Sequence, residues 1–399
     1  MLLENKSLSE ITEQDLLQLI DAKESEGKKL DFKRELPGNS DRDKKRFLED
    51  ICAFANAGGG FIIYGMEEKA GKATVLNGFQ TTNIDQEILR LQSIIQSGLA
   101  PRVPGIHMRP IGLSSGTSAL VIKIPLSWAS PHMITLEGAS KFYTRNSSGN
   151  YQMDVQEIKT AFLSSDSLST AIKDFRLNRL GRIVAGETPI LIKGNAKIIL
   201  HLIPLTALYN QSLIDMSIVL ERIRDLHTLY FSFCGFRINF DGAVTYSQKS
   251  DDRFVSYTQI FKNGIIEAVH DEILDEEDGK QSIPSSAFEK IIFTGCEKLL
   301  FFQNSIGIEP PIVVFLSLVG MSGYSFELSQ SQKFYYRRDF PVRVIDRDTL
   351  LTPEVMIQNF ESLDIHALLK PAIDSIWNAA GWPNSLNFDQ DGKWHGENY

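Results

Sequence analysis

The segment between residues 30 and 65 constrains the fold most, because it combines a strand, a helix and a second strand with clear boundaries. Leu30 and Phe32 alternate with Asp31 and Lys33, and this period of two predicts a strand with one apolar and one charged face. A helix capped by Ser40 follows and ends at three glycines, after which the nearly all-apolar stretch 61–65 predicts a central strand. The segment therefore indicates strands and helices packed into an α+β domain.

Further elements on both sides extend this domain. Thr12 and Asp15 predict a capping box for a helix over 13–22, with Leu16, Leu17 and Ile20 on its buried side. The other expected elements are a helix from Asn83 or Asp85, strands near 105–111, 119–124 and 141–145, and a helix from Asp154 to Leu163. We expect this first domain to span residues 1–165.

The serine-rich stretch 164–167 predicts a domain boundary, and residues 166–190 predict a helical connector. Its basic residues recur at three-residue steps: Lys173, Arg176, Arg179 and Arg182. We interpret this helix as a solvated amphipathic connector, with contact to phosphates as the alternative.

Residues 191–399 predict a second α+β domain, whose function the sequence does not indicate. The expected elements are strands over 197–205 and 312–319, hairpin turns at 241–242 and 263–264, and helices over 286–302 and 371–380.

Composition excludes some classes of protein. The chain has 399 residues, 43% of them hydrophobic, but no apolar run near the roughly 20 residues that a membrane span needs. No signal peptide is recognisable, and three widely spaced cysteines favour a reducing compartment, so we expect a cytoplasmic protein. The net charge of −9 argues against nucleic acid, yet the stretch from Lys23 to Arg46 holds nine basic and six acidic residues.

Three carboxylates near the N-terminus suggest chemistry: Glu26, Asp31 and Glu68. If the strand at Leu30 pairs with the strand before Glu68, the three can converge on one hard divalent cation, Mg²⁺ or Mn²⁺. Lys33, two residues after Asp31, would orient a water or stabilise developing charge. Three unrelated surface acids are the plainer interpretation of the same spacing.

Two longer stretches carry a family resemblance. Residues 26–33 (EGKKLDFK) and 53–68 (AFANAGGGFIIYGMEE), together with 142–148 (FYTRNSS), resemble the AlbA-like domain of the Schlafen family over about residues 10–165. The resemblance implies a mixed sheet with flanking helices.

The resemblance also implies an activity, because nuclease members of the family cleave structured RNA, such as tRNA, with three metal-binding acids. By position these fall on Glu26, Asp31 and Glu68, although the family's usual residues at the last two positions are Glu and Asp. We therefore expect a metal-dependent endoribonuclease acting in bacterial defence or stress, with Lys33 as a further catalytic residue. The expected phosphate contacts are Lys28, Lys29, Arg34, Lys44, Lys45, Arg102 and Arg145.

Other interpretations remain open. The larger family members grip RNA between two such lobes, so a single copy here predicts a homodimer. A non-catalytic regulator that binds DNA or RNA needs only the basic surface. A sensor or scaffold of a defence complex would instead bind a protein partner through the second domain.

Three weaker motifs favour structural roles. Glycines 58–60 lack the Lys and Ser or Thr of a phosphate loop and indicate a helix end with close packing. We expect His201 to be a hydrogen-bonded core residue and Trp377, Trp382 and Trp394 to serve in packing.

Overall fold

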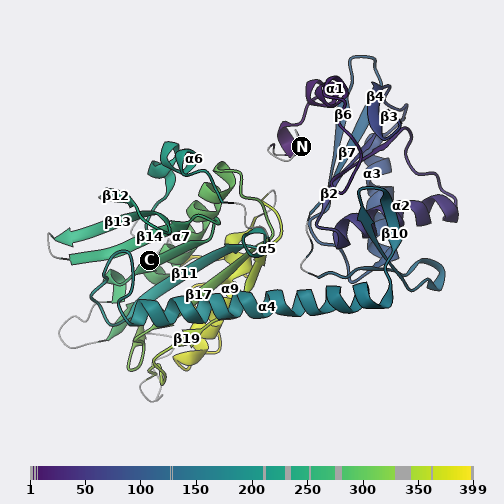
Figure 1. Ribbon diagram of the computed structural model, residues 1–399. Helices are drawn as coiled ribbons and strands as arrows, with labels where there is room; N and C mark the ends of the chain where they lie inside the picture. Colours follow the sequence, from purple (N-terminus) through teal and green to yellow (C-terminus); the bar gives the residue numbers. More distant parts are fainter. Residues whose placement is uncertain are drawn as a thin grey trace. The chain divides into compact units, whose positions relative to one another are not determined.

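The computed structural model describes residues 3, 6, 8–125, 127, 129–209, 213–229, 235–250, 253–274, 281–328, 343–360 and 363–396. The chain is α+β and divides into two compact units, Met1–Ala171 and Ile172–Tyr399 (Figure 1). The helices and strands of the first unit are α1 (Glu13–Asp21), β1 (Leu30–Lys33), α2 (Asp41–Asn56), β2 (Gly60–Tyr64), β3 (Met66–Lys69), β4 (Lys72–Leu76), α3 (Ile84–Gly98), β5 (Leu99–Ala100), β6 (His107–Gly112), β7 (Ser118–Ile124), β8 (Met133–Ile134), β9 (Lys141–Asn146), β10 (Gly149–Gln152) and the start of α4 (Val155–Val184).

The first unit is built on a mixed sheet in the order β1-β2-β7-β6. β1 runs parallel to β2, and the other pairings are antiparallel. One face packs on α2 and α3 through a core that includes Ile51, Ile62 and Ile122, and the other packs on α1 through a core that includes Leu16 and Phe61. The predicted mixed sheet with flanking helices is confirmed.

The predicted capping signals form as expected. The Asp15 carboxylate accepts a 2.9 Å hydrogen bond from the Thr12 amide, and Ser40 Oγ accepts one from the Asp43 amide at 3.2 Å. The glycine run ends α2, and a Cβ on Gly60 would lie 2.6 Å from the Lys29 carbonyl oxygen, too close for any other residue. One detail was wrong: Leu17 is 38% exposed, and Leu19 occupies the buried stripe of α1 instead.

Helix α4 is continuous from Val155 to Val184, so the serine-rich stretch 164–167 does not interrupt it. The division between the two units falls inside this helix, between Ala171 and Ile172. Serines are tolerated inside a helix when their hydroxyls donate hydrogen bonds to carbonyls of the preceding turn. Ser164 Oγ donates to the Thr160 carbonyl in this way, at 2.8 Å.

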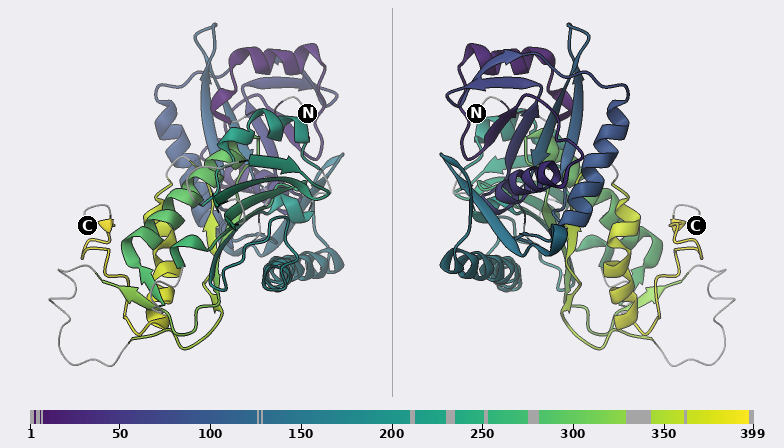
Figure 2. Two further views of the ribbon diagram at one scale, coloured as in Figure 1. Left: turned by 90° about the vertical axis from the view of Figure 1, so that its left-hand side faces the viewer. Right: turned by 90° about the vertical axis from the view of Figure 1, so that its right-hand side faces the viewer.

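The second unit contains one large antiparallel sheet in the order β12-β13-β14-β15-β11-β17-β19, with β20 also paired to β17. Helices α7 and α9 cover one face and the C-terminal part of α4 covers the other (Figure 2). Its elements are β11 (Lys197–Pro204), α5 (Thr206–Tyr209), α6 (Met216–Glu221), β12 (Gly235–Ile238), β13 (Gly242–Ser250), β14 (Arg253–Phe261), β15 (Ile266–His270), β16 (Ser282–Pro284), α7 (Ser285–Ser305), β17 (Ile312–Val319), β18 (Ser325–Glu327), β19 (Leu350–Leu351), β20 (Val355–Ile357) and α9 (Ile365–Ala379).

Two arginines of α4 anchor it to this sheet, which corrects the prediction of a solvated connector. Arg179 makes a two-point ion pair with the fully buried Glu267, at 2.7 and 2.8 Å. His201 Nε2 lies 3.1 Å from the same carboxylate, which confirms a hydrogen-bonded core histidine. Arg176 donates to Ser317 Oγ at 2.9 Å and is also buried.

The tryptophans at the C-terminal end pack as predicted, around one buried carboxylate. Glu289 of α7 accepts hydrogen bonds from Trp377 Nε1 at 2.8 Å, Trp394 Nε1 at 2.7 Å and Ser385 Oγ at 2.6 Å. Across the described ranges, none of the helices combines the length and the apolar character that crossing a bilayer would require.

Candidate functional site

Glu26 and Glu68 approach one another at the edge of the first sheet. β1 is the edge strand, and Glu26 Oε1 accepts a 2.8 Å hydrogen bond from the Phe32 amide. The β3–β4 turn brings the two acids together at Gly71: the Glu26 amide donates to the Gly71 carbonyl at 2.7 Å, and Glu68 Oε2 accepts from the Gly71 amide at 2.6 Å. The predicted proximity of these two acids therefore has a clear structural cause.

The electrostatics of Glu26 reflect its acidic neighbours. Burial raises the pKa of Glu26, and the nearby carboxylates of Asp31 and Glu68 raise it further, whereas the Phe32 amide and Lys33 act in the opposite direction. A carboxylate beside two others gains from any added cation.

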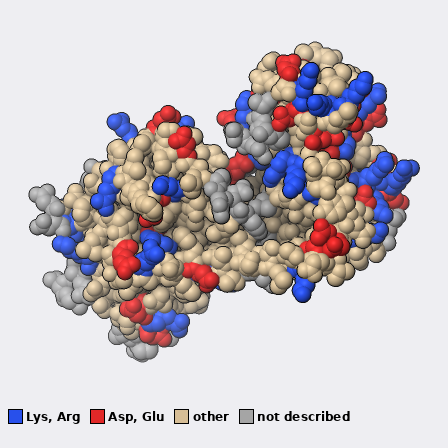
Figure 3. All heavy atoms as spheres, viewed as in Figure 1, with Lys and Arg blue, Asp and Glu red and all other residues tan. Residues whose placement is uncertain are grey.

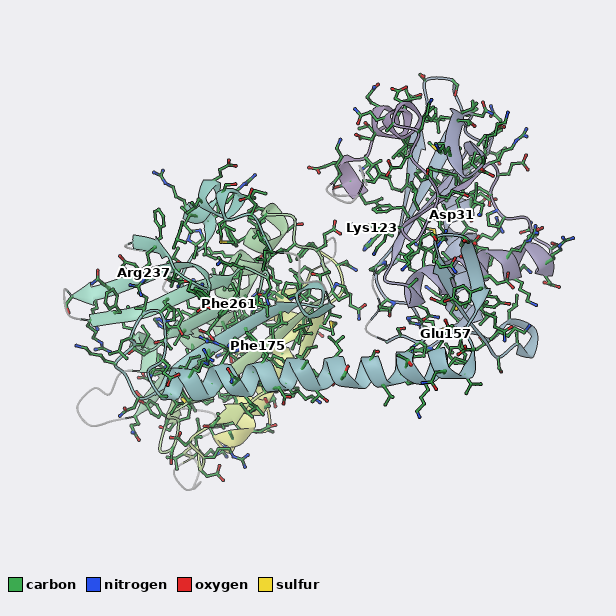
Figure 4. The ribbon with its side chains drawn as sticks, viewed as in Figure 1. Asp31, Lys123, Glu157, Phe175, Arg237 and Phe261 are labelled. Carbon is green, nitrogen blue, oxygen red and sulfur yellow. The ribbon has the colours of Figure 1, made fainter. Side chains whose placement is uncertain are left out.

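Asp31 faces α2, on the opposite side of β1 from the apolar residues Leu30 and Phe32. Figure 4 labels Asp31 in the first unit. Its carboxylate contacts two cations, Lys33 Nζ and Arg145, whose Nη2 lies 3.3 Å from Asp31 Oδ1. Arg145 is only 4% exposed and stacks on the Phe54 ring, with 3.9 Å between the guanidinium carbon and the ring centre. Its burial argues against the expected direct contact with phosphate and indicates that it supports Asp31.

A further carboxylate, Asp50 of α2, completes this cluster. Its Oδ2 lies 3.9 Å from Lys33 Nζ, and its Oδ1 accepts a 2.6 Å hydrogen bond from Asn150 Nδ2 in β10. Burial raises the pKa of Asp50 to about 6, with the nearby Lys33 opposing the shift. Desolvation lowers the pKa of Lys33, but Asp50 and then Asp31 raise it, and the net shift is upward, so Lys33 stays protonated at neutral pH.

In this arrangement the carboxylates already have other partners in the protein. The described residues contain no group of three or more His, Cys, Asp or Glu side chains placed to hold one. Lys33 and Arg145 form ion pairs with the Asp31 carboxylate. Glu26 and Glu68 each accept a hydrogen bond from a backbone amide with one carboxylate oxygen. The Mg²⁺ or Mn²⁺ site expected from the sequence therefore stays a prediction.

The expected phosphate contacts lie in different surroundings. Lys28, Lys29, Arg34 and Arg102 are exposed, and Lys44 and Lys45 of α2 are half-buried. Arg34 Nε lies 3.3 Å from Glu67 and Lys44 lies 3.2 Å from Asp41, so part of their charge is already paired. Figure 3 shows basic and acidic groups interspersed on the visible face of this unit.

Comparison with known protein families identifies the domain in the first unit. The family model described as Schlafen, AlbA_2 matches residues 26–154. The first unit carries a Schlafen AlbA_2 domain. The match includes Asp31, Glu68 and Arg145, and it begins at Glu26.

Two solved structures share similarity with part of this chain. One is the N-terminal domain of a protein described as RecG-related, from Nitrosomonas europaea, with 20% identity, a TM-score of 0.26, and coverage of 36% of this chain and 94% of that one. The other is the DIP2311 protein of Corynebacterium diphtheriae, with 19% identity, a TM-score of 0.24, and coverage of 35% and 27%. No curated protein matches the chain significantly.

Sequence reasoning missed Asp50 and assigned Arg145 a different role. Asp50 lies on α2, whose charged side chains at the surface show no signal that separates this one from its neighbours. The alternation of β9 places Arg145 on the same face as Tyr143, which packs against the α2 core, and that pattern indicates an inward position.

Proposed function

We propose that the AlbA_2 domain binds nucleic acid through the surface around β1 and the first turns of α2. The family match supports this proposal, and the basic residues that flank β1 and begin α2 carry the charge that phosphates require.

Lys28, Lys45 and Arg102 are the strongest candidates for phosphate contact. Among the described residues, none of the three has an ion-pair partner within 4 Å, in contrast to Arg34 and Lys44. Contacts of this kind position a duplex without selecting its sequence. We propose structured RNA, favoured over DNA, as the ligand because of the resemblance to the Schlafen family.

Fluorescence anisotropy with a labelled tRNA, an RNA hairpin and a DNA duplex of equal length tests this proposal. We expect saturable binding that is tightest for the RNAs and weakens steeply with salt. Absence of binding to all three at 50 mM salt would remove the proposal.

A second candidate function is metal-dependent cleavage of the bound RNA, with Glu26, Asp31 and Glu68 as metal ligands. The observation that favours it is the approach of Glu26 and Glu68, which both bond to the backbone of Gly71, and the nearby carboxylates of Asp31 and Glu68 also raise the pKa of Glu26. Lys33 supports it as well, because its charge lies beside Asp31 and is partly exposed, where it can meet a phosphate oxygen.

Incubation of tRNA with the protein and Mn²⁺ or Mg²⁺ tests the second candidate. We expect cleavage by the native protein and none by Glu26→Gln, whereas Glu24→Gln two residues away leaves it unchanged. Binding without cleavage in either metal would leave a non-catalytic nucleic-acid-binding protein.

We also propose that the second unit provides a protein interface, through which the chain forms a homodimer. β12 ends the sheet order, and the apolar residues on and beside it are exposed: Phe236 by 47%, Ile238 by 54% and Phe240 by 90%. Apolar edge strands of this kind pair with other chains.

A further inference from the structure

A groove lies beside the carboxylate cluster of the AlbA_2 domain, between the loop that follows β1 and the loop that precedes α3. Its volume is about 540 Å³, a size typical of ligand sites. Its lining consists of residues 34–39, residues 77–81, Glu87 and Arg90.

Hydrogen bonds fix both walls of the groove. On one side Arg90 Nη2 donates to the Pro37 carbonyl at 2.7 Å, while the same guanidinium pairs with Glu87. On the other side the Phe79 amide donates to the Ser118 carbonyl at 2.8 Å, and the Gly78 amide to the Gly65 carbonyl at 2.9 Å. The groove is therefore formed before any ligand arrives, which lowers the entropic cost of binding.

The lining matches the chemistry of a nucleobase. Asn39, Asn77 and Gln80 are exposed and offer amide donors and acceptors, and Phe79 presents a half-buried ring. The guanidinium groups at the groove are each paired with a protein carboxylate, Arg90 with Glu87 and Arg34 with Glu67. Glu35 adds one exposed carboxylate to the lining. The amides and the aromatic ring are groups that recognise unpaired bases by edge contacts and stacking.

The groove follows the carboxylate cluster closely along the chain. Arg34 follows Lys33 in the chain, and Glu67 precedes Glu68. The ion pair between Arg34 and Glu67, at 3.3 Å, joins the two segments where the groove begins. A nucleic-acid strand held beside Lys33 can therefore continue into the groove.

We propose that this groove binds an unpaired nucleotide of a single-stranded segment next to the structured RNA bound at β1. The assignment rests on the proposed nucleic-acid binding and adds a specific requirement to it, a junction between paired and unpaired nucleotides. The AlbA_2 domain would then bind RNA with overhangs or loops more tightly than a uniform duplex.

Anisotropy with two RNA hairpins, one blunt and one with a four-nucleotide single-stranded tail, tests the groove. We expect the tail to improve the affinity of the native protein about tenfold, the range of one stacked base. The double variant Asn39→Asp, Gln80→Glu adds two negative charges to the lining and should lose this advantage while binding the blunt hairpin almost as the native protein does. The matched control Gln92→Glu, Gln96→Glu adds the same charge on exposed positions of α3 and should keep it.

The outcomes separate the two proposals. Tight binding of the blunt hairpin with no gain in affinity from the tail overturns the groove assignment alone. An equal loss of the tail's contribution to affinity in both double variants has the same consequence. Binding of neither hairpin overturns the nucleic-acid function together with the groove. Calorimetry with a free nucleoside monophosphate tests whether the ligand of the groove is a nucleic-acid strand or a small molecule. Micromolar binding that the groove variant abolishes would assign the groove to a free nucleotide instead.

Discussion

The Arg145 guanidinium and the Asp31 carboxylate form a buried ion pair between β9 and β1, with 3.3 Å between Nη2 and Oδ1. Strand β9 is thereby tied to the strand that carries the candidate site, although 114 residues separate the two in the chain. The pair fixes Asp31 beside Lys33, and the arrangement of the cluster depends on it.

Replacing Arg145 with Met should therefore destabilise the AlbA_2 domain by about 3 kcal/mol, because Asp31 loses a buried cation. Hydrogen exchange measured by mass spectrometry should show faster exchange over β1 and β9. The double variant Asp31→Asn, Arg145→Met removes both charges and should recover part of the protection, and Lys141→Met on the same strand should have no effect. Equal exchange in native protein and Arg145→Met would contradict a stabilising role for the pair.

Asp50 should titrate far above an ordinary aspartate, with a midpoint near pH 6. The folded protein keeps this proton up to about pH 6, whereas an unfolded aspartate releases it near pH 3.9. Stability therefore falls as the pH rises between these values, by about 3 kcal/mol. Carboxyl ¹³C NMR should show the titration in native protein and lose it in Asp50→Asn; a midpoint near pH 4 would show that the carboxyl is solvated.

The local signals in the sequence were sufficient for much of the fold. Capped helices such as α2 and the continuous apolar strand β17 follow from residues close in the chain, and both form at the predicted positions. Helix α9 was predicted from Pro371, yet it starts at Ile365, where Asp364 Oδ1 accepts from the Ala367 amide at 3.1 Å. The prediction took Pro371 as the start of the helix and overlooked Asp364 as its N-cap.

The site was harder to predict, because its contacts join distant parts of the chain. The acidic motif indicated Asp31 and Lys33, but Asp50 and Arg145 reach them only through the packing of α2 and β9 on the sheet. Arg179 shows the same limit: its partner Glu267 lies 88 residues away, so three-residue spacing alone suggested solvent exposure. Periodicity identifies a face, whereas the partner of a buried charge depends on the tertiary fold.

Glu289→Gln should destabilise the second unit by about 2 kcal/mol. Glutamine offers one accepting oxygen where the carboxylate offers two, so either Trp394 or the pair Trp377 and Ser385 loses its acceptor. Urea unfolding followed by tryptophan fluorescence measures the loss, with Glu297→Gln, exposed on the same helix, as the control. Coincident unfolding curves would show that the hydrogen bonds to Glu289 contribute nothing.

Ile238→Lys should convert a homodimer into a monomer, because a charge on the exposed edge strand β12 opposes strand pairing. Light scattering after size-exclusion chromatography measures the mass of the native protein and the variant. Leu191→Lys is a matched control, because Leu191 and Ile238 are both 54% exposed. A native protein that is monomeric throughout would exclude the dimer.

The salt dependence of RNA binding tests the central claim most directly. Anisotropy with an RNA hairpin between 50 and 300 mM salt should give a linear decrease of log affinity with log salt for the native protein. The triple variant Lys28→Gln, Lys45→Gln, Arg102→Gln should bind more weakly and reduce the slope by about three, one unit for each lost phosphate contact. The triple variant Lys173→Gln, Arg182→Gln, Lys193→Gln in the second unit should leave affinity and slope unchanged. A slope that is the same in all three proteins, or no binding at all, would contradict recognition of phosphates by Lys28, Lys45 and Arg102.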